Sequence, residues 1–271
     1  MKSILLTNRP DVAQVAEAAR IDEIFVDLEV NGKLQRQKGR DTVISSHTID
    51  DVLSVRGVLD RTSLLVRCNP MGSYSRDELE RIIDAGADAI MLPYFHATSE
   101  VEKFISIISG RADTRLLVET PGAVNQISEI LSLEGIDGVH VGLNDLHIAY
   151  QSSSMFEPFC NGLLESLAPV FRAAGVPFGI GGVARMSSDL RPSPKRVIAE
   201  HRKLGSSAVI LSRSFTKINT EKLSEAGVEK LHQDLADFRE WWTSLDSWTE
   251  VDFKDNRAKL QTQIIQLINR L

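Results

Sequence analysis

The sequence has few cysteines and no long apolar run. Its two cysteines, Cys68 and Cys160, lie too far apart in the chain to suggest a disulfide framework. No stretch approaches the roughly 18 consecutive apolar residues of a membrane-spanning helix. The first residues, MKSILLTNRPDVAQ, hold too short an apolar run for a signal peptide. These absences predict a cytoplasmic protein with no membrane partner.

The chain also lacks an excess of positive charge. Its net charge is −6, from 37 acidic and 31 basic residues. A mildly acidic chain is a poor match for nucleic acid or anionic lipid, so we expect neither as a partner. A glycine-rich phosphate turn is missing after the first apolar run, where LLTNRPD stands instead. This argues against a doubly wound open sheet, the alternative α/β fold.

Short apolar runs do alternate regularly with segments of helical pattern. Nearly continuous apolar content is typical of parallel strands that are covered on both faces. Eight strand–helix repeats predict a (β/α)8 barrel, the TIM-barrel fold. The predicted strands are residues 4–6, 24–28, 64–67, 89–92, 116–119, 138–141, 177–180 and 208–211.

Several helix boundaries are also marked in the sequence. Ser-x-x-Glu patterns at 75–78 and 99–102 predict capping boxes, in which serine and glutamate side chains satisfy the first backbone N–H groups of a helix. Ser193-Pro194 predicts another helix start, with proline at the first helical position, and Gly205 predicts its end.

The chain is expected to divide into a catalytic barrel and a tail. We predict a TIM-barrel domain over residues 1–218 and a helical C-terminal extension over 219–271. All three tryptophans, Trp241, Trp242 and Trp248, lie in the extension. The extension is predicted either to cap the barrel or to form a subunit interface, where aromatic residues are enriched. We expect a homo-oligomer.

Polar residues gather at the predicted strand ends, where barrel enzymes carry their active sites. They are Asp27, Glu29, Arg67, Glu119 and Asp145. Acids packed closely repel one another unless a cation compensates. Two carboxylates, with water or substrate completing the shell, suit Mg²⁺ or Mn²⁺. Arg67 would suit a substrate carboxylate or a developing enolate oxygen. The alternative is that the acids only form salt bridges with Arg67 and bases at the rim.

Two more segments near the predicted mouth carry charge. The segment FGIGGVAR, with Arg185 and later Arg213, predicts either a phosphate or carboxylate site or glycines that only relieve crowding. The loop after the second strand is basic and predicts either a solvated surface or a contact with an anionic substrate or a neighbouring subunit. Its basic residues are Lys33, Arg36, Lys38 and Arg40.

Five motifs in fixed order resemble those of a known family. They are FVDLE (25–29), LVRCN (65–69), IIDAGADAIMLP (82–93), LLVETPGAV (116–124) and DGVHVGLNDLH (137–147). Over roughly residues 1–215 the chain resembles the HpcH/HpaI aldolase and citrate lyase β-chain family of metal-dependent barrels.

The resemblance assigns roles to individual residues. It implies that Glu119 and Asp145 are the metal ligands and that Arg67 binds the carbonyl or enolate oxygen of a pyruvate-like group. Backbone amides of Gly142 and Leu143 would approach the substrate carboxylate.

The resemblance also covers three further acids. Asp27 and Glu29 match the acids that orient metal-bound water. Asp84 matches the acid that partners a catalytic histidine in the aldolases.

That histidine is where the chain departs from the aldolases. Their pattern reads Asp-x-Glu-His, whereas Val30 follows Glu29 here. Citrate-lyase-like relatives also read Asp-Leu-Glu. His47 and His147 are the candidates to replace the missing group in proton transfer. His140, inside a predicted strand, is expected to be a packed, hydrogen-bonded core residue.

Three functions follow from this reading. The first is a metal-dependent carbon–carbon lyase, an aldolase that joins or cleaves a 2-oxo acid and an aldehyde, which could be sugar-derived. The second is a lyase acting on an acyl-CoA thioester of the citrate or malyl-CoA type. The third is a non-catalytic metal-binding barrel that lacks the usual base.

Overall fold

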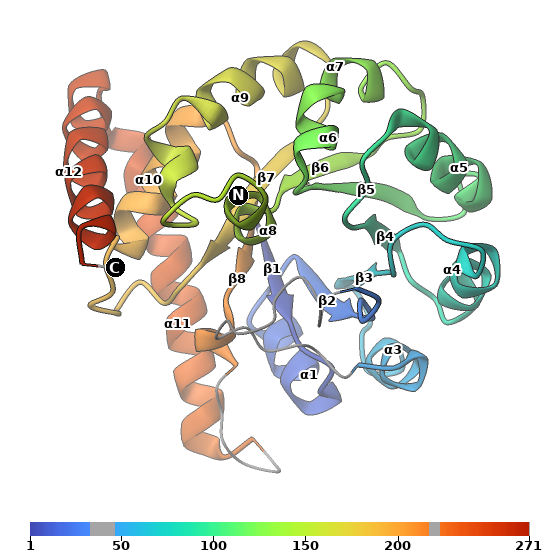
Figure 1. Cartoon of the computed structure of the whole chain (residues 1–271). Helices are drawn as coiled ribbons and strands as arrows, with labels where there is room; N and C mark the ends of the chain where they lie inside the picture. Colours follow the sequence, from blue (N-terminus) through green and yellow to red (C-terminus); the bar gives the residue numbers. More distant parts are fainter. Residues whose placement is uncertain (33–46, 217–222, 271) are drawn as a thin grey trace.

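A computed structural model describes residues 1–32, 47–216 and 223–270. Eight parallel strands form a closed barrel in chain order, with β8 pairing β1 (Figure 1). The predicted (β/α)8 barrel is therefore confirmed. The basic residues of the loop after the second strand, Lys33, Arg36, Lys38 and Arg40, lie outside the described residues. The strands are β1 (Lys2–Leu6), β2 (Glu23–Asp27), β3 (Ser63–Arg67), β4 (Ala89–Leu92), β5 (Asp113–Val118), β6 (Gly138–Val141), β7 (Phe178–Val183) and β8 (Ala208–Leu211).

Side chains along each strand point alternately into the lumen and toward the helices. The lumen is filled by a small apolar cluster: Ile4, Phe25, Leu65, Ala89, Met91 and Leu117. The much larger cluster lies outside the strands, under the helices. Because Asp27 and Arg67 stand two residues after Phe25 and Leu65, the same alternation brings both polar side chains into the lumen, at its C-terminal mouth.

The opposite end of the lumen is closed by charge. The Glu23 carboxylate is almost fully buried and lies 2.8 Å from Nζ of Lys2 and 3.5 Å from Nη2 of Arg115. Arg115 also pairs with Asp113 at 3.0 Å. Because TIM barrels carry their active sites at the C-terminal ends of the strands, the site is expected at the mouth.

Helices cover the outside of the barrel, and short 3₁₀ segments join them (Figure 1). The helices are α1 (Pro10–Ala18), α3 (Ile49–Arg56), α4 (Ser75–Asp84), α5 (Thr98–Ile108), α6 (Pro121–Asn125), α7 (Ile127–Ile130), α8 (Leu143–Ala149), α9 (Leu163–Ala173), α10 (Pro194–Leu204), α11 (Glu225–Ser244) and α12 (Glu250–Ile268). The 3₁₀ segments are η1 (Glu157–Phe159), η2 (Arg213–Phe215) and η3 (Leu245–Ser247).

Both predicted capping boxes are wrong in detail. α4 begins at Ser75 itself, and the Ser75 hydroxyl accepts the N–H of Gly72 at 2.8 Å. α5 begins at Thr98, where Glu100 accepts the N–H of Ala97 at 3.0 Å. The pattern located both helices, but it could not show that other backbone donors nearby compete for these side chains.

The predicted boundaries of α10 are confirmed. Pro194 begins the helix and Gly205 ends it with a left-handed backbone, φ 81°. A β-carbon is disfavoured there by sterics, whereas Gly57, at the end of α3, has an ordinary φ of −64°.

Gly205→Ala should therefore lower the free energy of unfolding by about 1 kcal/mol. Gly57→Ala is the matched control. It should be neutral or stabilise by about 0.5 kcal/mol, because alanine restricts the unfolded chain more than glycine does. Urea unfolding of both variants measures the difference, and equal values would contradict the backbone argument.

The last two helices have different roles. α11 packs between α1 and α10, the place of the eighth barrel helix, and Trp241 on α11 donates to the Lys195 carbonyl at 2.9 Å. α12 lies outside α10, held by Asn256 donating to the Arg196 carbonyl at 3.1 Å (Figure 1). α11 therefore completes the ring of helices around the barrel, and α12 lies outside that ring. The division into a barrel domain over residues 1–218 and a helical extension over 219–271 remains a prediction.

The tryptophans of this region pack within the chain. Trp248 meets Trp241 edge-on at 5.8 Å between ring centroids, and the Arg202 guanidinium lies 4.9 Å from the ring of Trp242. These contacts favour the cap interpretation for the tryptophans. The homo-oligomer remains a prediction.

Within the described ranges, no helix combines the length and the apolar content needed to cross a membrane.

Candidate active site

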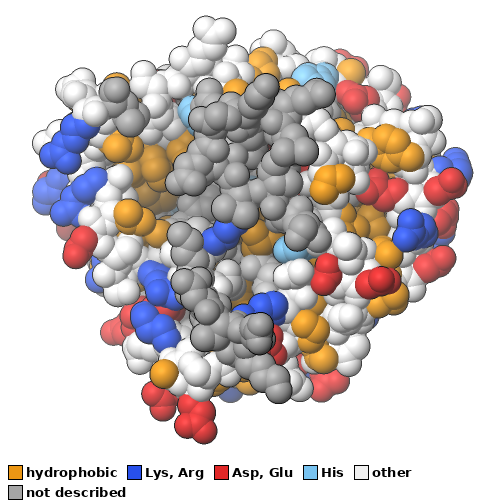
Figure 2. All heavy atoms as spheres, turned by 60° about the horizontal axis from the view of Figure 1, so that its bottom comes forward, with side chains coloured by type: hydrophobic (Ala, Val, Ile, Leu, Met, Phe, Trp, Pro, Cys, Tyr) orange, Lys and Arg blue, Asp and Glu red, His pale blue; other side chains and the backbone are white. Residues whose placement is uncertain are grey.

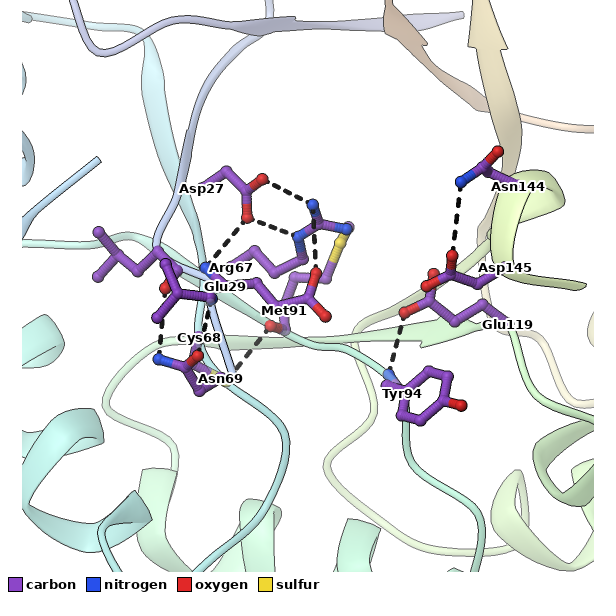
Figure 3. Close-up of polar contacts among 12 residues, drawn as sticks. Asp27, Glu29, Arg67, Cys68, Asn69, Met91, Tyr94, Glu119, Asn144 and Asp145 are labelled. Carbon is purple, nitrogen blue, oxygen red and sulfur yellow. Dashed lines mark hydrogen bonds and ion pairs between the residues drawn. The ribbon is translucent and has the colours of Figure 1, made fainter. Parts of the chain in front are cut away.

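One side of the mouth is built by β2 and β3 around Arg67. Its Nε lies 2.8 Å from Oδ1 of Asp27, and its Nη2 lies 2.7 Å from Oδ2, so the pair is bidentate (Figure 3). Glu29 approaches the same Nη2 at 3.4 Å. Asp27 and Glu29 are each only 1% exposed. A guanidinium fixed at two edges in this way presents its remaining donors in one direction.

Arg67 stays charged at this site. Burial by itself lowers the pKa of the guanidinium, but the charges of Asp27, Glu29 and Glu119 outweigh it and raise the pKa above its ordinary value. The group also lies over the ring of Phe25, 5.6 Å from its centroid. The influence of Glu119 shows that the two sides of the mouth interact electrostatically.

The other side of the mouth is built by the ends of β5 and β6. Glu119 follows β5, is 4% exposed and accepts the N–H of Tyr94 at 3.1 Å. Tyr94 has a left-handed backbone, φ 49°, which is uncommon for a residue other than glycine. Asp145 lies in the first turn of α8, is 6% exposed and accepts from the Asn144 amide at 3.4 Å.

Gly142 brings the two carboxylates to one place. A β-carbon added there would lie 2.7 Å from both Cβ and Oε2 of Glu119, so only glycine fits. Gly142 is the N-cap of α8, and Asp145 follows one turn later on the same face. Glu119 and Asp145 therefore lie together, across the mouth from Arg67 (Figure 3). Leu143 is 2% exposed and packs over Gly181.

On the face that Figure 2 turns forward, histidine side chains lie among acidic and basic ones. His47 reaches the rim of the mouth, where it contacts Asp27. Its Nδ1 accepts the backbone N–H of Asp27 at 3.0 Å. In the neutral ring the proton therefore sits on Nε2. That tautomer makes His47 a hydrogen-bond donor on its other side, and its accepting nitrogen is already used.

Two predicted residues do not join the cluster. Asp84 is the last residue of α4 and is exposed. Because α4 runs back from the mouth toward the start of β4, Asp84 lies at the opposite end of the barrel within one chain. His147 is on α8, two residues after Asp145, and side chains two apart on a helix do not face each other. For both residues, position in the motif did not indicate direction in space.

His140 is a core residue, as predicted. It is 3% exposed, and its Nε2 lies 2.8 Å from the Gly181 carbonyl. A β-carbon on Gly179 would come within 2.3 Å of its Nδ1, so this glycine makes room for the ring. Burial lowers the pKa of His140 to about 4.

This lowered pKa predicts acid sensitivity. The unfolded chain binds the proton near pH 6.5, whereas the folded chain resists it until about pH 4, so stability falls as pH falls through this window. At pH 5 the loss from this residue should be about 2 kcal/mol. His140→Gln, which keeps a donor for Gly181, should flatten the decline between pH 7 and pH 5 in urea unfolding. An unchanged pH slope would contradict it.

The glycine-rich end after β7 serves packing at two positions. Gly179 accommodates His140 and Gly181 accommodates Leu143. Arg185 pairs with the buried carboxylate of Asp234 on α11 at 2.8 Å. Arg213 is half-buried at the end of β8, where burial lowers its pKa and the charge of Asp27 raises it, which places it near the mouth. The relief-of-crowding interpretation therefore fits these glycines.

Sequence reasoning missed two features that position the site. Tyr94 supplies a backbone donor to Glu119, and nothing in the motif indicates its left-handed backbone. Asn69 links the β2 and β3 loops through its side chain. Its signal was its place directly after Arg67-Cys68 and before Pro70, which restricts the preceding residue to extended backbone.

The fold and this mouth define a (β/α)8 barrel with an acid–arginine site at the C-terminal ends of its strands. Within that class, the chain belongs to the HpcH/HpaI aldolase/citrate lyase family, whose model matches residues 4–176, more than half of the sequence. The predicted resemblance is confirmed. No curated protein sequence matches the chain significantly.

Solved structures agree on the fold. An HpcH/HpaI aldolase from Desulfitobacterium hafniense DCB-2 is similar with a TM-score of 0.58 at 16% identity, over 78% of this chain and 85% of that one. An HpcH/HpaI aldolase/citrate lyase family protein from Burkholderia cenocepacia J2315 gives 0.63 at 15%, over 88% and 94%. A citrate synthase variant, SbnG, gives 0.55 at 16%, over 88% and 93%. At these identities the likeness concerns the fold alone.

Proposed function

We propose that this protein is a metal-dependent carbon–carbon lyase that forms or uses the enolate of a pyruvate-like 2-oxo acid, with an aldehyde as the second substrate. The observation that carries the proposal is the pair of buried carboxylates, Glu119 and Asp145, facing the fixed guanidinium of Arg67 across one mouth. Membership of the family supports a lyase or aldolase type of enzyme.

The two carboxylates fit a hard divalent cation. Both are at least 94% buried and offer oxygen donors, which suit Mg²⁺ or Mn²⁺. Two like charges this close are stabilised by a cation between them. Among the described residues, no group of three or more His, Cys, Asp or Glu side chains is placed to hold a metal. Water and substrate would therefore complete the shell. A bound ion would act as a Lewis acid on the oxo group.

Arg67 contributes charge where the enolate oxygen develops. Its bidentate bond to Asp27 uses Nε and Nη2 and so orients the guanidinium before substrate arrives. Glu119 fills the space beside Gly142, and the Gly142 N–H donates to the Val118 carbonyl at 2.9 Å. Of the two backbone amides predicted to approach the substrate carboxylate, that of Leu143, at the start of α8, is therefore the better candidate.

Proton transfer needs a group other than the aldolase histidine. Val30 occupies that position and is 45% exposed. His47, with its proton on Nε2, is suited to donate rather than to accept. We therefore expect His47 to donate a hydrogen bond to substrate or water at the mouth, while a water molecule there takes up and returns the proton.

Cleavage of an acyl-CoA thioester is the second candidate. The Asp-Leu-Glu sequence of residues 27–29 favours it, because citrate-lyase-like relatives share this sequence. Val30 counts against it, because that branch has a second acid directly after the glutamate.

Deuterium exchange of pyruvate, with assays of metal binding and thioester cleavage beside it, separates the candidates. Pyruvate is incubated in D₂O with Mn²⁺ or with a chelator, and loss of the methyl proton signal is followed by NMR. The lyase proposal predicts exchange that requires the metal. Metal binding without exchange would indicate a non-catalytic barrel, and thioester cleavage of malyl-CoA without exchange would favour the second candidate.

A further inference from the structure

Asn69 lies at the centre of a hydrogen-bond network behind the mouth. Its Oδ1 accepts the N–H groups of Val30 and Asn31, each at 2.9 Å. Its Nδ2 donates to Oε1 of Glu78 at 2.6 Å and to the Leu28 carbonyl at 3.3 Å. The side chain thus uses both donors and both acceptor sites, and it is only 9% exposed.

Glu78 determines which way the Asn69 amide faces. A carboxylate only accepts hydrogen bonds, and a backbone N–H only donates them. The NH₂ group of Asn69 must therefore face Glu78 on α4, and its oxygen must face the loop after β2. Glu78 also accepts the backbone N–H of Asn69 at 3.3 Å. Burial raises the pKa of the Glu78 carboxyl, and its bonds from Asn69 oppose that rise.

The loop held in this way carries Glu29. Asn69 forms hydrogen bonds with the residues on both sides of Glu29: Leu28 before it, and Val30 and Asn31 after it. Glu29 reaches Nη2 of Arg67, which stands two residues before Asn69 on the same strand end. The Leu28 N–H, which donates to the Arg67 carbonyl at 2.9 Å, ties the start of this loop to β3. Asn69 therefore fixes the part of the loop that follows Glu29.

We propose that Asn69 and Glu78 form a positioning pair that holds Glu29 against Arg67 and so aims the guanidinium into the mouth. The pair touches no substrate and acts through Arg67. This proposal rests on the proposed function for its consequence in catalysis, but its structural part can be tested alone.

The test exchanges the hydrogen-bond donor and acceptor roles of Asn69 and Glu78. Asn69→Asp places a second carboxylate against Glu78, so the contact holds only when the two share a proton, and the defect should grow as pH rises. The double variant Asn69→Asp/Glu78→Gln restores a donor opposite an acceptor. Glu78→Gln alone is the matched control, because its amide oxygen can still accept from Asn69.

Amide hydrogen exchange measures directly whether the positioning pair holds the loop after β2. Val30 and Asn31 should be protected in the wild type, lose protection in Asn69→Asp and regain it in the double variant. Leu65 and Val66, inside β3, should stay protected in all of them, which shows that the barrel remains folded. Equal protection of Val30 and Asn31 in the wild type and Asn69→Asp would overturn the proposal, as would a double variant no better protected than the single one.

The affinity for oxalate, a planar analogue of the pyruvate enolate, measures the consequence for substrate binding at the mouth. With Mn²⁺ present, calorimetry at pH 8 should show oxalate binding about 10²-fold weaker in Asn69→Asp, the scale of a misplaced binding group, and recovery to within about tenfold in the double variant. Loss of loop protection with unchanged oxalate affinity would overturn the positioning role. If the wild type itself bound no oxalate, the proposed function would fail. The amide hydrogen exchange of Val30 and Asn31 would still decide whether the positioning pair holds the loop.

Discussion

Asp145→Asn should reduce metal-dependent exchange of pyruvate methyl protons by about 10³-fold, the largest effect that we expect from one substitution on activity. The change removes one of two carboxylates that would hold the cation, and a lost Lewis acid is worth several kcal/mol, at about tenfold per 1.4 kcal/mol. The substituted amide keeps the size of the side chain and can still accept from Asn144, so the fold should persist. Exchange is measured by NMR, and metal affinity by calorimetry.

Asp77→Asn is the matched control for this prediction. Asp77 is an exposed acid in the first turn of α4, as Asp145 is a buried acid in the first turn of α8. The control should keep both metal affinity and exchange. Full activity of Asp145→Asn would remove this residue from the metal site and with it the basis of the lyase proposal.

Arg67→Met should destabilise the protein by about 3–5 kcal/mol, because removing one partner leaves buried charges uncompensated. Two acids, Asp27 and Glu29, each 1% exposed, face this guanidinium. Methionine fills most of the volume but neutralises neither carboxylate. Urea unfolding at pH 7 measures the loss, and Arg76→Met, an exposed arginine on α4, should change stability by no more than about 0.5 kcal/mol.

The pH dependence of Arg67→Met identifies the cause. Without the guanidinium, the folded state of the variant holds uncompensated buried negative charge. The folded state then binds more protons, so the deficit is largest at high pH and shrinks as pH falls. Asp27→Asn added to Arg67→Met should recover part of the stability at pH 7. A deficit that is independent of pH would instead indicate lost packing against Phe25.

The strands and the sides of the mouth were predictable because each depends on local pattern. Continuous apolar runs located every strand, and alternation from Phe25 and Leu65 brings Asp27 and Arg67 into the lumen. Glu119 and Asp145 followed from their places at strand ends, since parallel strands share one carboxyl edge.

The positions of side chains in space and their long-range partners were not predictable from the local sequence pattern. Asp84 matches a family motif but ends α4 at the far end of the barrel, because a helix reverses the chain direction. Glu78 fits a capping pattern yet bonds to Asn69, a competition that only the folded loops create. The packing of α11 between α1 and α10 is likewise a long-range contact that the local pattern of residues 225–244 does not show.

The closure of the ring by α11 also has a consequence for the order of events during synthesis. Arg185, beside the glycine-rich mouth, pairs with Asp234 on α11, and the Leu223 N–H just before α11 donates to Asp11 on α1 at 3.1 Å. The first βα unit therefore meets the helix that closes the ring. A growing chain therefore cannot complete its mouth until residues near 244 have left the ribosome. Before that point the nascent barrel exposes the flanks of α1 and α10 against which α11 packs. This interval is when a chaperone would be most needed.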